Sequence, residues 1–280
     1  MKKKTIPFVI LTLLHLILLG YTLFYKKKQN VWILLLSSIS IAFVFEYFVL
    51  NVFKMYMYYP KVFKNKWQDS VFGGILSQAV FVPIKATFLA SFQYGWRGRI
   101  IAGIAFSLVE RLFIFLGVFK NITWRTTYTL TLIPMYFWIV QKWWNGLQRN
   151  VDGIKKGTLF FCYWTIYTNT YFILTTVFKK FLFQTGFVRN KYRDDYLTGP
   201  IYTFLLSMIG TISTLFMKGK WKILGVVIMH ICDQAILKLG ILRMKNWNVY
   251  AFLPLHLLML LVGEHSQSMI QKISKKEFIK

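Results

Sequence analysis

The sequence alternates long apolar stretches with short polar segments along its whole length. A stretch of about 20 apolar residues is long enough to cross the hydrocarbon core of a bilayer as an α-helix. The pattern therefore predicts an all-α, polytopic helical membrane protein with about nine transmembrane helices. The predicted spans cover residues 6–24, 31–53, 70–92, 100–119, 127–140, 158–178, 197–217, 223–239 and 249–263.

The composition supports this fold class. Hydrophobic residues make up 56% of the 280 positions and the mean hydropathy is +0.48. A soluble domain of this length has one core and seldom carries so much apolar surface. Pairs of large aromatic residues, such as Trp143-Trp144 and Tyr58-Tyr59, lie near predicted span ends, as is typical of the membrane interface.

The chain is strongly basic, with a net charge of +26 from 35 Lys and Arg against 9 Asp and Glu. The basic residues occupy the segments between apolar stretches, where they face anionic lipid headgroups and anchor the helices. A nucleic-acid-binding protein would gather them on a soluble domain, and the pattern predicts none. We therefore expect the lipid bilayer as partner and no nucleic acid, and protein partners remain open. Cys162 and Cys232 lie inside predicted spans without metal-binding or disulfide spacing, and we expect no cofactor.

A four-helix pattern occurs twice in the sequence. The run NKWQD at 65–69 precedes the third predicted span, and the run NKYRD at 190–194 precedes the seventh. Matches that keep their order over a long stretch indicate an internal repeat. Further matched pairs are Gly74 and Gly199, Arg99 and Lys222, Glu110 and Asp233, Gly117 and Gly240, Trp124 and Trp247, and Pro134 and Pro254.

The even number of spans in the repeat fixes its topology. Both copies must enter the membrane from the same side, which gives a parallel repeat about an axis along the membrane normal. We predict an N-terminal transmembrane helix in residues 1–30, a first repeat in 31–150, and a second repeat with a basic C-terminal tail in 151–280. The loops at 54–64 and 179–189 interleave aromatic with basic residues, and we expect them to lie in the headgroup layer.

The stretch WRTTYTLTLIP at 124–134, together with Asp69 and Glu110, carries a resemblance. It resembles an uncharacterised family of small four-helix membrane proteins from spore-forming Gram-positive bacteria, and the whole chain is similar to a tandem duplication of that unit. The resemblance implies a multi-pass protein of the bacterial cytoplasmic membrane and supplies no activity. The second copy departs from the pattern, because Asp233 stands in place of Glu110 and the threonines before the last span are mostly lost.

Four ionisable residues of the first repeat fall within predicted spans, namely Glu46, Lys85, Glu110 and Arg111. An isolated charge in a bilayer costs about 2.5 kcal/mol or more, so we expect these side chains to pair as a buried cluster of zero net charge. The second repeat retains only an acid, at Asp233. Such a cluster is either a functional site or a clamp between helices, and the sequence leaves both readings open.

Two further sets of polar residues are candidates. His230 lies one turn before Asp233 on a predicted helix face, and this pair is a weak metal-site candidate; no metal-binding motif accompanies it, so we expect no metal. Asp69, Asp194 and Asp195 stand where spans begin, and we expect them to cap those helices and offset their dipoles. Binding of a cation is the alternative role for these three acids.

These patterns favour a non-enzymatic transport, channel or lipid-handling module with a buried charged cluster. A structural subunit of an envelope or spore membrane complex is the first alternative. A membrane-embedded enzyme acting on a lipid is less favoured, because the sequence contains no nucleophile-elbow, phosphate-loop or dinucleotide-binding motif.

Overall fold

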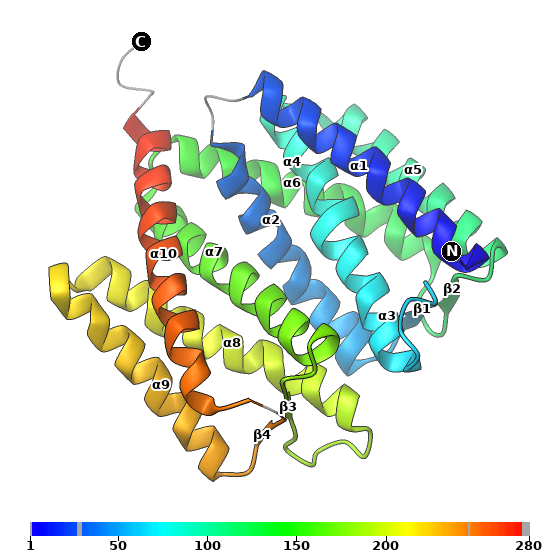
Figure 1. The fold of residues 1–280 in the computed structure, drawn as a ribbon. Coiled ribbons are helices and arrows are strands. Elements are labelled where there is room, and N and C mark those ends of the chain that lie inside the picture. Colours follow the sequence, from blue (N-terminus) through cyan, green and yellow to red (C-terminus); the bar gives the residue numbers. More distant parts are fainter. Residues whose placement is uncertain (1, 27–29, 246, 276–280) are drawn as a thin grey trace. The chain divides into compact units, whose positions relative to one another are not determined.

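The computed structural model describes residues 2–26, 30–245 and 247–275. Within these ranges the chain is almost entirely helical and divides into two compact units, residues 1–149 and residues 150–280 (Figure 1). The described residues form nine long helical segments when helices that continue without a break are counted together. The prediction of an all-α protein is therefore confirmed.

The first unit joins its helices with one two-stranded antiparallel sheet. A short 3-10 helix precedes the first long helix, and two of the long helices contain a π-helical turn. The elements in chain order are η1 (Lys3–Thr5), α1 (Ile6–Tyr25), α2 (Val31–Glu46) with the π segment η3 (Tyr47–Val52), β1 (Tyr56–Tyr58), α3 (Lys66–Ile75) continuing through the π segment η4 (Leu76–Phe81) into α4 (Val82–Ser91), α5 (Trp96–Phe115), β2 (Phe119–Asn121) and α6 (Thr126–Gln148).

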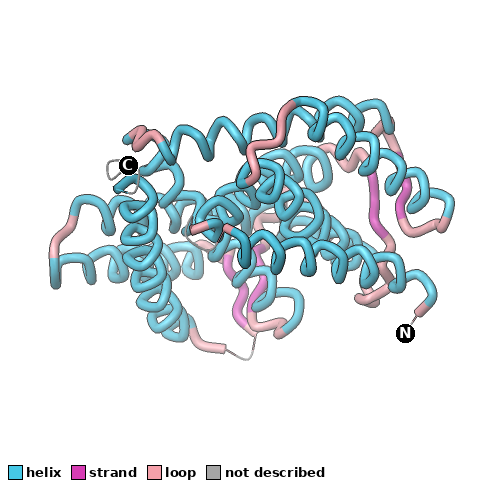
Figure 2. The backbone as a smooth tube through the Cα atoms, turned by 90° about the horizontal axis from the view of Figure 1, so that it is seen from above, coloured by secondary structure: helices cyan, strands magenta, loops and turns pink. Residues whose placement is uncertain are grey.

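The second unit has four long helices and a sheet of the same kind, so the extended segments in the described chain are two short strand pairs (Figure 2). Its elements are α7 (Asp152–Phe172) with the π segment η5 (Ile173–Val177), β3 (Phe181–Phe183), α8 (Lys191–Phe216), the 3-10 helix η6 (Gly219–Lys222), α9 (Ile223–Lys238), β4 (Leu242–Met244), the 3-10 helix η7 (Val249–Ala251) and α10 (Phe252–Lys275).

Five of the nine helical segments are long and apolar enough to cross a membrane. They are Lys3–Tyr25, Val31–Val52, Lys66–Ser91, Lys191–Phe216 and Val249–Ile273. The other four are more polar: α5, for example, has 20 residues but contains three arginines and one glutamate. The chain is thus a membrane protein by the length and composition of five helices, and the nine-span arrangement stays a prediction.

The sequence pattern did not foresee the strand pairs, which include part of each of the loops at 54–64 and 179–189. β1 pairs with β2 and β3 pairs with β4, each over three residues. The side chains of β3 are buried inside the second unit, and the two tyrosines of β1 are buried inside the first. Cross-strand pairing satisfies backbone groups and hides the aromatic rings inside each unit, and the place of these loops in the headgroup layer stays a prediction.

A glycine turns the chain from helix into strand in both units. Gly117 follows α5 with φ of +62°, and Gly240 follows α9 with φ of +70°. In each case the next N–H reaches back five residues, from Val118 to Phe113 O and from Ile241 to Ile236 O. This is the Schellman closure, in which the residue at the left-handed position is glycine because a Cβ would be strained there.

Each unit buries its own apolar interior. In the first unit, Leu19 of α1, Leu35 and Ile39 of α2, and Ile84 of α4 form one buried cluster. In the second unit three tyrosines recur every fourth residue along α7, at Tyr163, Tyr167 and Tyr171, and all three are buried. Residues four apart share one helix face, so α7 presents a row of rings, each with a polar hydroxyl, to the interior of its unit.

Candidate functional site

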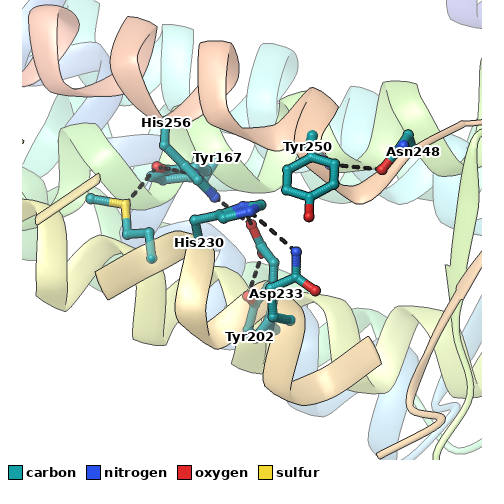
Figure 3. A network of polar contacts seen from close by, with 9 residues as sticks. Tyr167, Tyr202, His230, Asp233, Asn248, Tyr250 and His256 are labelled. Atoms are coloured by element: carbon teal, nitrogen blue, oxygen red, sulfur yellow. Dashed lines mark hydrogen bonds and ion pairs between the residues drawn. The ribbon is translucent and has the colours of Figure 1, made fainter. Parts of the chain in front are cut away.

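A hydrogen-bonded network surrounds Asp233 in the interior of the second unit (Figure 3). Tyr202 donates its hydroxyl hydrogen to Asp233 Oδ1 at 2.6 Å, and His256 Nε2 lies 2.7 Å from Asp233 Oδ2. On the far side of the ring, His256 Nδ1 lies 3.0 Å from the hydroxyl of Tyr167. These residues belong to α7, α8, α9 and α10, so the network joins all four long helices of the unit.

The network is closed off from solvent. Asp233, His256 and Tyr167 have an exposed fraction of 0%, and Tyr202 has 7%. A buried carboxylate is tolerable only where donors reach its oxygens, and here a hydroxyl and an imidazole N–H reach one oxygen each. Hydrogen bonds from the Tyr202 hydroxyl and the His256 imidazole therefore stabilise Asp233 inside an apolar helix bundle.

The ring of His256 keeps its hydrogen bonds in both protonation states. When the ring is neutral, Nε2–H donates to Asp233 and Nδ1 accepts from the Tyr167 hydroxyl. When the ring is protonated, Nδ1–H donates to the Tyr167 oxygen, and the Tyr167 hydrogen turns to Met229 Sδ, which lies 3.1 Å away. The site can thus take up a proton by rotating one hydroxyl and without leaving a buried group unpaired.

His230 lies beside this network without joining it by a hydrogen bond. Its Nδ1 atom is 3.7 Å from Asp233 Oδ2, while its Nε2 atom is 3.2 Å from the Gln234 side chain (Figure 3). Within the described ranges, no group of three or more His, Cys, Asp or Glu side chains is arranged to hold a metal ion. His230 and Asp233 are therefore neighbours on one helix face, with the nearer imidazole contact to the carboxylate coming from His256.

In the first unit Glu110 of α5, which the predicted repeat matches to Asp233, accepts hydrogen bonds from neutral donors. Thr126 donates to Glu110 Oε1 at 2.7 Å and Asn121 Nδ2 donates to the same oxygen at 3.2 Å, while Thr129 donates to Oε2. The donors come from β2 and the first turn of α6. Glu110 thus ties the end of its own helix to the strand and the helix that follow it.

A second acid of the first unit, Glu46, is also held by neutral groups. The hydroxyl of Tyr56 in β1 donates to Glu46 Oε2, and Gln78 Nε2 donates to the same oxygen at 3.0 Å. Gln78 lies in the π segment η4 of the long helix. Tyr56 lies in strand β1, outside the helices. Burial is the main cause and the nearby Glu46 carboxylate the second cause that raise the pKa of Tyr56 well above its ordinary value, so this hydroxyl stays protonated and can donate.

The predicted neutral cluster of Glu46, Lys85, Glu110 and Arg111 does not form. None of the ion pairs recorded for the described residues joins any two of these four side chains. Arg111 points outward and is exposed, and the Lys85 ammonium lies 5.3 Å from the ring centre of Phe88. Depth explains the difference, because Lys85 lies 19 residues into its helix, about 28 Å from the strand pair, whereas both acids lie near the strand end of theirs.

The helix-start acids are not the caps that the sequence predicted. The caps are Asn65 and Asn190, whose side chains each accept two backbone N–H groups at the starts of α3 and α8. Asp69 lies four residues after the cap Asn65 and accepts the N–H groups of residues 61, 62 and 63. Four residues beyond each cap, an acid therefore fastens the preceding loop.

In the second unit, Asp194 and Asp195 both accept hydrogen bonds from the segment that precedes α8. Asp194 accepts from the Gly186 N–H at 2.8 Å and the Thr185 hydroxyl at 2.6 Å, which fastens the loop before α8. Asp195 accepts from the N–H of Phe183 at 2.8 Å, which fastens strand β3 to the helix. Five carboxylate oxygens of Asp69, Asp194 and Asp195 accept hydrogen bonds from protein donors in this way, which leaves the cation-binding alternative without support in the described contacts.

Sequence reasoning missed the tyrosines that complete these sites, namely Tyr56, Tyr167 and Tyr202. The four-residue spacing of the α7 tyrosines was a usable signal, since it predicts a buried polar row on one helix face. Tyr56 carried no comparable signal, because a three-residue strand is too short for its periodicity to be read. Comparison of the chain with protein-family models, with curated proteins and with solved structures finds no match in any of the three.

Proposed function

We propose that this chain is an integral protein of the bacterial cytoplasmic membrane in which all nine helical segments cross the bilayer and one four-helix unit occurs twice. Local details that recur at a constant distance along the sequence support the duplication. The capping asparagines Asn65 and Asn190 are 125 positions apart, and so are Tyr56 and Phe181, which open the first strand of each pair. Helix, π turn, strand, capped helix, helix, glycine closure, strand and helix follow in the same order in both units.

The function that the geometry supports best is transport of protons, alone or with a solute, through the second unit. The observation that carries this proposal is the chain of hydrogen bonds from Tyr202 through Asp233 and His256 to Tyr167. Ionisable groups inside membrane helices are expensive to keep and are characteristic of proton relays and ion pathways. This pair can also change its protonation state without losing a hydrogen bond, as a proton carrier must.

Enzymatic chemistry receives less support from the same contacts. A general base or nucleophile needs an acceptor that is free to face a substrate atom. Both oxygens of Asp233 and of Glu110 already accept hydrogen bonds from side chains of their own unit. Asp233 therefore suits proton transfer within the unit, and Glu110 suits a structural contact between helices, better than either suits attack on a lipid.

Proteoliposomes provide the test. Purified protein is reconstituted with a pH-sensitive dye inside the vesicles, a potassium diffusion potential is imposed, and the initial rate of internal pH change is recorded. We expect proton entry well above that of empty vesicles, and a loss of about tenfold or more in Asp233→Asn and His256→Gln. Asp152→Asn, which removes an exposed carboxylate, serves as the charge-matched control and should retain the rate. A wild-type rate equal to that of empty vesicles would remove transport and leave the structural alternative.

The alternative, a structural subunit of an envelope or spore membrane complex, has one specific observation in its favour. In the first unit the buried acids accept hydrogen bonds from amide and hydroxyl donors, which do not titrate in the ordinary pH range. These contacts hold helices and strands together and suit a structural role. A stoichiometric protein that remains bound through purification in mild detergent, combined with an absence of proton entry, would favour this reading.

A further inference from the structure

Arg99 in the first turn of α5 is a buried cation that has no carboxylate partner among the residues that the structure describes. Its exposed fraction is 7%, and its Nη2 group donates to Gln141 Oε1 of α6 at 2.5 Å. Gln141 in turn donates to Gln93, which donates to Asn145 at 3.1 Å. The guanidinium therefore ends a row of neutral amides, and its Nε–H has no hydrogen-bond partner among the described residues.

In the second unit, the cation Lys222 has a carboxylate partner. Gly117 and Gly240, which close α5 and α9, are 123 positions apart, and the same interval leads from Arg99 to Lys222. Lys222 Nζ donates to Glu264 Oε1 at 2.9 Å, which is an ion pair between the corresponding helices. One unit thus neutralises its cation internally, whereas the other has an amide where the carboxylate would be.

No other acid of the first unit is free to neutralise Arg99. Residues 1–149 contain three acids, Glu46, Asp69 and Glu110. Each accepts hydrogen bonds near a strand pair or a helix start, as described above, and none contacts the guanidinium. A charge kept from water without a counter-charge is costly, so an anion from outside the chain would stabilise this position.

We propose that Arg99, with Gln141 and the first turn of α5, binds a phosphate group, either that of an anionic lipid headgroup or free phosphate. The two Nη groups of an arginine form the planar end of a fork that matches two phosphate oxygens, and the Arg99 Nη groups are not among the buried, unpaired atoms of the described residues. The Gln141 amide orients the fork, and the Trp96 ring, whose centre is 4.9 Å from the guanidinium carbon, covers one face of it. The first turn adds backbone N–H groups, since the N-cap residue Gly95 has no side chain to occupy them. This site does not depend on the proposed proton pathway, which lies in the other unit.

Native mass spectrometry of the purified, delipidated chain tests the proposal. The probes are phosphatidylglycerol, phosphatidylcholine and inorganic phosphate, titrated separately. We expect one tight phosphatidylglycerol adduct and a weaker phosphatidylcholine adduct if a lipid is the ligand, or saturation by inorganic phosphate alone if the free ion is. In Arg99→Met the tight adduct should weaken by about tenfold or more, because the charge-assisted fork is gone.

The decisive variant is Gln141→Glu, which rebuilds the Lys222–Glu264 arrangement in the first unit. The new carboxylate should satisfy Arg99 from within, so the tight adduct should disappear while the thermal midpoint of the delipidated protein stays equal or rises. That midpoint also shows that the variant folds, which keeps the experiment informative. Lys222→Met is the matched control and should leave the tight adduct unchanged. Anion binding that survives both Arg99→Met and Gln141→Glu would overturn the proposal, as would its absence in the wild-type chain.

Discussion

The imidazole of His256 lies 2.7 Å from the carboxylate of Asp233, and neither side chain is exposed. The two residues are 23 positions apart and belong to α10 and α9, so their contact is a long-range product of the fold. With Tyr202 and Tyr167 at its two ends, this pair is the point at which the four long helices of the second unit meet through polar groups. Its energetic weight can be measured separately from any transport activity.

We expect Asp233→Ala to lower the free energy of unfolding by about 3–5 kcal/mol, because it leaves His256 and Tyr202 buried without their partner. Reversible unfolding in mixed micelles, with helicity followed by circular dichroism, would measure the loss. The control is Lys156→Ala, which removes a partner of Asp152 in an exposed ion pair and should change stability within the error of the measurement. Equal losses in the two variants would contradict the structural importance given to the buried pair.

Asp69 and Asn65 should have separable effects on local backbone opening. Asp69→Ala removes the acceptor of three loop N–H groups, so the amides of residues 61–63 should exchange with deuterium faster. Asn65→Ala removes the helix cap at a cost of about 1 kcal/mol and should instead speed exchange at Trp67 and Gln68. Hydrogen exchange followed by mass spectrometry distinguishes the two patterns, and identical patterns would refute the division of roles.

The buried tyrosines of β1 should make the first unit sensitive to alkali. Burial raises the pKa of Tyr56 and of Tyr58 above the value of about 10 that a tyrosine has in the unfolded chain. The unfolded chain then ionises first, so the stability that these residues provide is present below about pH 10 and is lost as the pH rises further. The free energy of unfolding should therefore fall above this pH, and it should fall less steeply in Tyr56→Phe. A slope unchanged in both Tyr56→Phe and Tyr58→Phe would mean that neither ring is protected in the folded chain.

Gly74 and Gly199, which the proposed repeat pairs with each other, should tolerate alanine differently. A Cβ on Gly74 would lie 2.6 Å from Glu46 Oε1 and 2.8 Å from Leu50 Cδ2. Because Tyr56 and Gln78 hold Glu46 in place, the carboxylate has little freedom to move, and Gly74→Ala should cost about 1–3 kcal/mol. A Cβ on Gly199 would meet no atom closer than 3.5 Å, so Gly199→Ala should be neutral or stabilising. Thermal unfolding of both variants in the same detergent checks this, and a larger loss at Gly199 would contradict it.

The acids of the chain show where sequence reasoning reached its limit. The sequence identified Glu46, Glu110 and Asp233 as buried charges that need partners, and all three are buried. It did not identify the partners of Glu46 and Glu110, because it sought opposite charges within spans and the actual donors are hydroxyls and amides from strands and neighbouring helices. Pairing with a neutral donor leaves no complementary charge pattern in a sequence.

Local chemistry was readable from the sequence because it acts over a few residues. The apolar run lengths determined that the chain is helical and suited to a bilayer, and the order of matched residues from Asn65 to Gly117 and from Asn190 to Gly240 indicated a repeat. Tertiary structure alone decided which groups meet: the strand pairs, the joining of four helices at Asp233, and the contrast between Arg99–Gln141 and Lys222–Glu264. Those contacts join residues up to 89 positions apart in one unit, as Tyr167 and His256 are, and only the folded chain brings such residues within hydrogen-bonding distance.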